Sequence, residues 1–321
     1  MKLGRAAGVT DTGRRRLRNE DAFICEPPLF AVADGMGGAR AGEVAAGLTA
    51  AALEEAGGEI RGGTGLAALI EEANRRIWER SLADPETAGM GAVVTAALVD
   101  TDAATVTIGH VGDSRAYRIR DHAIEQLTTD HSLVAELVES GVLTPEEAER
   151  HPQRSAITRA LGTEPAVSVD TLTMEAEPAD LYLLCSDGLS IMLGDDEIAE
   201  IVASTRGDLA QAAESLVRAA NAHGGEDNIT VVLFEIVLDD AELETGHPDV
   251  DPATATVEED AGGDDRTQLV GSTPEEHVEA ETAGGSLRRH GAGSGGRLAA
   301  ILLLVAVLGL ALVLLYVGAL R

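Results

Sequence analysis

Four aspartates stand where apolar runs of this sequence begin or end. Asp34 follows LFAVA, Asp187 follows LYLLCS, Asp113 follows TVTIGHVG, and Asp227 precedes NITVVLF. A single aspartate at a strand end is an ordinary turn residue. Four are harder to explain in this way, because carboxylates that converged to about 4 Å would repel one another unless cations lay between them. The pattern therefore predicts a divalent metal site with oxygen ligands.

Magnesium or manganese fits such a ligand set best, since both ions prefer carboxylate oxygens. No set of His and Cys residues accompanies the aspartates, which argues against zinc. The glycines after Asp34 fit the same interpretation. Gly35 would let a backbone carbonyl approach a metal, and Gly37 and Gly38 would leave room for a substrate.

The pattern of apolar and polar residues predicts the elements that position these side chains. Neighbouring apolar runs are joined by tight polar turns, which favours antiparallel strands over a doubly wound sheet. We expect strands at 30–33, 93–99, 105–111, 116–119, 123–127, 181–185 and 230–236. We expect helices at 42–55, 66–82, 133–140, 145–150, 195–203 and 208–223.

Composition limits the classes of function. The 321 residues include 55 acidic and 24 basic side chains, for a formal net charge of −31. This charge would repel nucleic acid and favour metal cations or basic partners, so DNA binding is disfavoured. Cys25 and Cys185 lie in apolar stretches without the paired spacing of a zinc site, and we interpret them as reduced core residues.

The C-terminal part has a different composition. Residues 298–320 carry no charge, and about 23 residues at ~1.5 Å each would span a ~30 Å hydrocarbon core. Arg288, Arg289 and Arg297 precede this run, which places the preceding residues on the cytoplasmic side. We therefore expect a folded domain at 1–238, an acidic disordered linker at 239–297 and a single transmembrane helix at 298–320, holding the domain at the inner membrane face.

An ordered set of motifs resembles the metal-dependent protein phosphatases of type 2C, in particular bacterial membrane-tethered serine/threonine phosphatases. The motifs are RxxNED (16–21), ADGMGGxxxGE (33–43), GDSR (112–115), TxDH (128–131), HPQRSxxxRALG (151–162), SDGLS (186–190) and DNITVV (227–232). The resemblance covers about residues 4–238. It implies an α+β fold in which two stacked antiparallel sheets are flanked by helices, αββα, with metals at one end.

The resemblance also implies the activity and the metal ligands. A water activated by two Mn²⁺ or Mg²⁺ ions would hydrolyse phosphoserine and phosphothreonine in proteins, in line and without a phospho-enzyme. Asp34 would bridge the ions, the Gly35 carbonyl would bind one, and Asp187 and Asp227 would hold the other. Glu20 and Asp21 would act nearby through bound water. The implied partners are phosphoproteins and membrane-associated serine/threonine kinases.

Three arginines are the implied contacts of the substrate. Arg16 would clamp phosphate oxygens, a task suited to a planar bidentate donor. The stretch 131–162 resembles a flap beside the active site, in which Arg154 and Arg159 would contact the phosphopeptide. We expect structural or flap roles for His131 and His151, and a core position for His110 on an apolar strand.

Three places depart from the pattern of the family, one of them Ala92–Val93, where bacterial members commonly have two threonines. Met36 stands where eukaryotic members often have a histidine that could act as general acid. Ile191 stands where many members have an aspartate that helps to hold a third metal, so we expect Asp113 alone to hold a third cation weakly. Ile191 also keeps open a non-enzymatic alternative, a tethered pseudo-phosphatase that binds phosphoproteins as a scaffold. A further reading, an aspartyl-phosphate hydrolase built on Asp100 and Asp102, lacks the other elements of that family.

Overall fold

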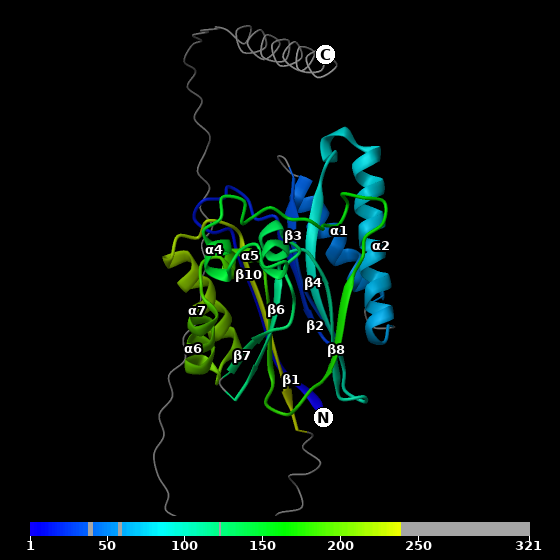
Figure 1. The fold of residues 1–321 in the computed structure, drawn as a ribbon. Coiled ribbons are helices and arrows are strands. Elements are labelled where there is room, and N and C mark those ends of the chain that lie inside the picture. The colour runs from blue at the N-terminus through cyan, green and yellow to red at the C-terminus, as the bar shows by residue number, and fades with distance from the viewer. Residues whose placement is uncertain (38–40, 57–59, 122, 239–321) are drawn as a thin grey trace, which may run out of the picture. The chain divides into compact units, whose positions relative to one another are not determined.

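The computed structural model describes residues 1–37, 41–56, 60–121 and 123–238. Two five-stranded sheets lie face to face (Figure 1). In order across the sheet, the first contains β1 (Lys2–Asp11), β10 (Ile229–Val237), β9 (Leu181–Cys185), β6 (Arg115–Arg120) and β7 (Ala123–Gln126). The second contains β2 (Asp21–Glu26), β3 (Leu29–Met36), β4 (Gly91–Asp100), β5 (Thr105–Val111) and β8 (Asp170–Glu175). Every pair of neighbouring strands is antiparallel.

Helices cover the outer face of each sheet. Helices α1 (Ala41–Ala56) and α2 (Gly62–Ala83) pack on the second sheet, and α6 (Asp195–Thr205) and α7 (Leu209–Ala222) pack on the first (Figure 1). Shorter helices are η1 (Pro85–Thr87), α3 (Leu133–Glu139), α4 (Pro145–Glu149) and α5 (Asp187–Ser190). The expected pair of antiparallel sheets flanked by helices is therefore confirmed.

The two sheets and the two pairs of helices form four layers, and three apolar clusters fill the spaces between them. Strand β3 contributes side chains to two of these clusters. Phe30 and Val32 point between the sheets, whereas Ala31 and Ala33 point towards α1 and α2. Successive side chains of a strand point to opposite faces, so a strand buried on both sides is apolar at nearly every position. Phe30 stacks on Phe234 of β10 with ring centroids 4.2 Å apart, which joins the two sheets.

The three strands missing from the sequence prediction, β1, β2 and β8, are all edge strands. Strand β8 is exposed at most positions, and β1 contains Gly4, Arg5 and Gly8 among half-buried residues. An edge strand buries little of its surface, so it lacks the apolar pattern by which strands are recognised. Helix α5 was also missed, because its four residues are too few for helical periodicity to emerge.

No helix within the described ranges is long and apolar enough to cross a membrane. The predicted linker at 239–297 and the predicted membrane span at 298–320 lie outside those ranges. Asp100 ends β4 and Asp102 lies in the turn to β5, where Asp100 Oδ1 accepts hydrogen bonds from the backbone N–H groups of Asp102 and Ala103. They are ordinary turn residues.

Candidate active site

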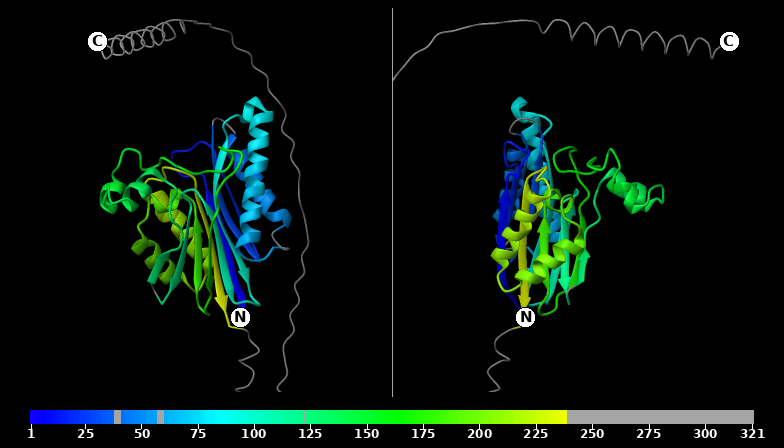
Figure 2. Two further views of the ribbon diagram at one scale, coloured as in Figure 1. Left: turned by 45° about the vertical axis from the view of Figure 1, so that its right-hand side comes forward. Right: turned by 90° about the vertical axis from the view of Figure 1, so that its left-hand side faces the viewer.

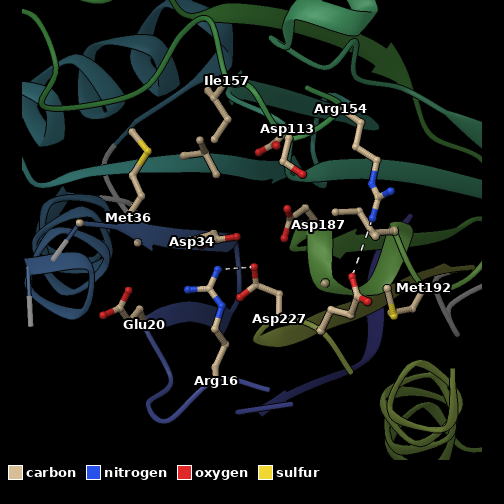
Figure 3. Close-up of a pocket in the computed structure, with 17 residues that line it drawn as sticks. Arg16, Glu20, Asp34, Met36, Asp113, Arg154, Ile157, Asp187, Met192 and Asp227 are labelled. Carbon is tan, nitrogen blue, oxygen red and sulfur yellow. Dashed lines mark hydrogen bonds and ion pairs between the residues drawn. The ribbon is translucent and has the colours of Figure 1, made fainter. Parts of the chain in front are cut away.

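A pocket of about 340 Å³ lies at one end of the two sheets, and acidic side chains dominate its centre (Figure 3). It gathers segments that are far apart in the sequence: the loop before β2, the end of β3, the β5–β6 turn, the start of α5, the loop before β10 and a segment after α4. The lining includes Arg16, Glu20, Asp34, Gly35, Met36, Gly37, Asp113, Arg154, Ile157, Asp187, Ile191, Met192, Glu226 and Asp227. The four aspartates at strand ends thus share one pocket.

Strand β3 delivers Asp34 to the pocket through close backbone packing. In the sheet, Asp34 lies opposite Asp21 of β2 and Val93 of β4. A Cβ on Gly35 would lie 2.0 Å from the carbonyl oxygen of Gly42 in α1, and Gly35 N donates to the carbonyl of Glu20 over 3.1 Å. Only glycine allows these three segments to meet behind Asp34. Packing is thus a second reason for this glycine, besides the access to its carbonyl that the sequence suggested.

Helix α5 and the loop before β10 place Asp187 beside Asp227. A Cβ on Gly188 would lie 2.0 Å from the carbonyl oxygen of Asn228, so the two backbones are in direct contact. The Asn228 side chain accepts a hydrogen bond from Glu20 N and donates to the carbonyls of Thr12 and Arg18, over 2.8 to 2.9 Å. Asn228 therefore holds the loop before β2 against the site. The motif DNITVV contained this residue, but its sequence alone did not indicate the role.

Asp21 lies behind the pocket rather than in its lining. Its Oδ2 accepts hydrogen bonds from Thr230 Oγ1 at 2.6 Å and from Ser186 Oγ at 2.9 Å. Burial raises the pKa of Asp21 to about 6, although these two hydroxyl groups oppose the shift. Asp21 lies opposite Asp34 on the neighbouring strand, so it stands behind the residues that line the pocket.

The pocket carboxylates destabilise one another's charge. The pKa of Asp34 is raised well above its ordinary value, first by burial and then by the charges of Asp21, Asp187, Asp113 and Asp227. Burial followed by the charges of Asp113 and Asp227 raises the pKa of Asp187 in the same way. Such a group of acids stays ionised at neutral pH only if positive charge is supplied between them.

The donor atoms fit divalent cations. Asp21 Oδ1 and Asp187 Oδ1 are buried and have no hydrogen-bond partner among the described residues. Within the same residues, no three His, Cys, Asp or Glu side chains are arranged to hold one ion by themselves. The unpartnered carboxylate oxygens suit Mg²⁺-like ions, which take one or two carboxylates each and complete their shell with water. The Gly35 carbonyl adds a backbone oxygen to the candidate ligands.

Two arginines reach the pocket from different sides (Figure 3). Arg16 Nη2 lies 2.6 Å from Asp227 Oδ2, and Arg154 Nη2 lies 3.8 Å from Glu226 Oε2. Arg159, the third predicted substrate contact, does not line the pocket. Its Nη1 lies 2.6 Å from Asp170 Oδ1 at the start of β8. The structure thus brings Arg16 and Arg154 to the site and turns Arg159 towards the sheet.

Histidines support the pocket from outside it. His131 Nδ1 accepts a hydrogen bond from Gly112 N, next to Asp113, and its Nε2 lies 3.0 Å from Asp170 Oδ2. His110 Nδ1 lies 2.9 Å from Thr95 Oγ1. None of the histidines in the described ranges lines the pocket. His131 also begins the segment that leads into α3 and α4, which project from the sheets (Figure 2).

Comparison with known proteins places this site in a family. Residues 13–232 match the family described as protein phosphatase 2C. The chain belongs to this family.

Two curated relatives and two solved structures illustrate the relationship. The serine/threonine phosphatase stp of Listeria monocytogenes is 41% identical over 238 residues, covering 70% of this chain and 93% of the relative. The serine/threonine protein phosphatase PstP of Mycobacterium tuberculosis is 42% identical over 240 residues, covering 73% of this chain and 45% of PstP. The crystal structure of the M. tuberculosis phosphatase PstP/Ppp has a TM-score of 0.70 at 39% identity and covers 74% of this chain and 100% of that structure. A structure of the PstP catalytic domain in complex with two manganese ions has a TM-score of 0.67 at 38% identity, covering 73% and 99%.

Proposed function

We propose that this protein is a metal-dependent phosphatase that hydrolyses phosphoserine and phosphothreonine in proteins. The observation that carries the proposal is the meeting of Asp34, Asp187 and Asp227 in one pocket beside Arg16. Membership of the protein phosphatase 2C family supports the reaction class. The named relatives are serine/threonine phosphatases, which supports the substrate class.

Two Mn²⁺ or Mg²⁺ ions are the proposed cofactors. Asp34, the Gly35 carbonyl, Asp187 and Asp227 would hold them directly, and Glu20 and Asp21 would act through water. When bound, the ions supply a water nucleophile that is active at neutral pH and positive charge for the phosphoryl group. Support comes from the unpartnered oxygens of Asp21 and Asp187 and from the two manganese ions of the PstP structure.

The chain's own residues orient the phosphoryl group. Arg16 presents a planar, permanently charged donor that can bind two phosphate oxygens at once. Its contact with Asp227 at 2.6 Å holds the guanidinium at the acidic centre before substrate arrives. No histidine of the described ranges lines the pocket. The leaving serine or threonine oxygen would therefore take its proton from water or from another group.

The proposed third cation would bind weakly. Asp113 lines the pocket. Ile191 also lines it, at the C-terminal end of α5, but its apolar side chain cannot bind a metal. A third ion would therefore depend on one aspartate and water. A titration that found three ions of comparable affinity would contradict this part of the proposal.

We further propose that residues 298–320 anchor the protein in the membrane and keep the phosphatase at the cytoplasmic face. The uncharged run and the arginines at 288, 289 and 297 support this arrangement. Anchoring would raise the local concentration of the enzyme near membrane-associated serine/threonine kinases and their substrates.

Manganese-dependent phosphate release tests the enzymatic proposal. The full-length chain should release phosphate from a phosphothreonine peptide when Mn²⁺ is present and stop when EDTA removes it. Asp34→Asn should reduce the rate by at least about a hundredfold, because a central ligand charge is lost. A chain that binds the phosphopeptide but releases no phosphate would be the scaffold alternative, and release that EDTA leaves unchanged would exclude metal-dependent hydrolysis.

A further inference from the structure

A short basic segment borders the acidic pocket. Residues 14–18 read RRRLR, and we call them the arginine loop. Arg16 turns into the pocket, whereas Arg14, Arg15, Leu17 and Arg18 are exposed. The loop precedes Glu20 of the pocket by only a few residues. Three exposed guanidinium groups therefore lie on the same short loop as the proposed phosphate clamp.

The backbone of the arginine loop is fixed by hydrogen bonds at both ends. The carbonyl of Gly225 accepts from Arg14 N at 2.7 Å and from Arg15 N at 3.2 Å. At the other end, Asn228 Nδ2 donates to the carbonyl of Arg18 over 2.8 Å. Gly13, just before the loop, has φ +77°, and a Cβ there would lie 2.0 Å from the Asp227 carbonyl. The loop therefore presents its side chains from a pre-organised backbone, which lowers the entropy lost on binding.

The exposed arginines form no ion pair with a carboxylate in the described part of the chain. Arg16 pairs with Asp227 and Arg154 pairs with Glu226, but no described carboxylate lies within ion-pair distance of Arg14, Arg15 or Arg18. The chain as a whole carries a net charge of −31. A basic loop at the edge of the pocket would therefore attract an acidic segment that the rest of the protein repels.

We propose that the arginine loop is a docking surface for acidic residues that flank the phosphorylated residue of a substrate. This inference rests on the proposed phosphatase function and narrows its substrate class to phosphoproteins with acidic residues near the phosphorylated site. An extended peptide advances about 3.4 Å per residue. With its phosphate at Arg16, the peptide would pass the neighbouring arginines within a few residues, and each guanidinium can bind a carboxylate through two hydrogen bonds.

The test compares two substrates in the full-length chain, purified in a non-ionic detergent with Mn²⁺. One is a phosphothreonine peptide flanked by glutamates, and the other carries glutamines at the same positions. We define the preference as kcat/KM for the glutamate peptide divided by kcat/KM for the glutamine peptide. The triple variant Arg14→Ala, Arg15→Ala, Arg18→Ala should lower this ratio about tenfold. Higher salt should reduce the preference of the unchanged chain and leave that of the variant unaltered.

Matched controls separate docking from chemistry and from net charge. Hydrolysis of p-nitrophenyl phosphate, which has no flanking residues, should be the same in the triple variant and the unchanged chain; its absence in both would instead refute the proposed function. The variant Arg61→Ala, Arg75→Ala, Arg218→Ala removes the same charge at exposed positions outside the pocket lining and should keep the preference. Leu17→Ala, which changes the loop but not its charge, should keep it too.

Three outcomes would overturn the inference. The first is an unchanged preference in the triple variant. The second is a higher kcat/KM for the acidic peptide in the triple variant than in the unchanged chain. That result would mean that the acidic residues 239–282 of the chain itself occupy the arginine loop. The third is an equal loss of preference in the control triple variant, which would mean that net charge alone attracts acidic peptides.

Discussion

At the scale of single residues, Arg16 shows how one side chain can serve both the resting site and the substrate. Its guanidinium lies 2.6 Å from Asp227 and is half exposed, so a phosphate can reach it from the pocket. A carboxylate partner holds the planar group in place without filling all of its donors. The arrangement favours binding of a phosphate at the acidic centre, where the charge of the bound cations would otherwise act alone.

Substitution of Arg16 should separate geometry from charge. Arg16→Ala should lower kcat/KM for a phosphothreonine peptide by about a hundredfold, because two charge-assisted hydrogen bonds are lost. Arg16→Lys should lose about tenfold, since lysine keeps the charge but not the planar fork. Steady-state kinetics would measure both values. Arg159→Ala provides the comparison: its guanidinium is turned towards Asp170, so a loss as large as that of Arg16→Ala would contradict the orientation seen here.

Some site residues could be predicted from sequence and others could not. The aspartates were visible because each interrupts an apolar run at a strand end. Asn228 was not, because its three hydrogen bonds go to backbone groups that are far away in the sequence. Arg159 was assigned to the substrate by its motif, and its pairing with Asp170 depends on where β8 begins.

At the scale of elements, direct backbone contacts hold the pocket together. Helix α5 begins with Asp187, and its second residue, Gly188, meets Asn228, the residue just before β10. The start of α1 meets β3 in the same way, through Gly42 and Gly35. The first contact lies on the side of the first sheet and the second on the side of the second sheet. The positions of the acids therefore depend on the packing of both sheets rather than on any one loop.

A single methyl group at the α5–β10 contact should disturb both stability and metal binding. Gly188→Ala would place Cβ about 2.0 Å from the Asn228 carbonyl, so the two segments must separate. We expect the free energy of unfolding to fall by about 2 kcal/mol and the affinity for Mn²⁺ to fall at least tenfold. Urea denaturation and metal titration would measure the two effects.

Gly47→Ala is the matched control for this substitution. Gly47 lies in α1, and a Cβ there would meet nothing within 4 Å. Alanine in a helix should raise the free energy of unfolding by about 0.5 to 1 kcal/mol. If Gly188→Ala raised the free energy of unfolding as Gly47→Ala does, and left the affinity for Mn²⁺ unchanged, the close contact between Gly188 and Asn228 would be contradicted.

The predictability of the elements follows from burial. Strands β4 and β9, buried along nearly their whole length, gave continuous apolar runs in the sequence. Strands β1, β2 and β8 lie at sheet edges. Polar residues make up most of β8, occur within β1 and stand at both ends of β2. An edge strand forms because it pairs in register with a neighbouring strand. The sequence of the edge strand alone does not contain this information.

At the scale of the whole molecule, the net charge and the proposed membrane anchor would both limit which substrates reach the active site. A net charge of −31 repels anionic partners, which would give the basic loop at the pocket edge greater weight in selecting substrates. An anchor at 298–320 would confine that selection to proteins near the membrane. The fold class was predictable because ordered motifs identify a family, whereas placement in the cell depends on residues outside the described ranges.

Membrane attachment should depend on the apolar run. Substitution of Leu304→Arg together with Leu310→Arg places two charges near the centre of the run, where each costs about 2.5 to 3.5 kcal/mol on insertion. The double variant should move from the membrane fraction to the soluble fraction of cells, as measured by sedimentation after alkaline extraction. Recovery of the unchanged chain in the soluble fraction would refute the anchor.

The central claim is that carboxylates from distant strands meet around a pair of divalent cations. The most direct measurement is a titration of the full-length chain with Mn²⁺, in which electron paramagnetic resonance reports the free ion. We predict two tightly bound ions per chain and a loss of at least one of them in Asp34→Asn. Binding of no more than one ion, or two ions that Asp34→Asn holds as tightly as the unchanged chain, would contradict the account.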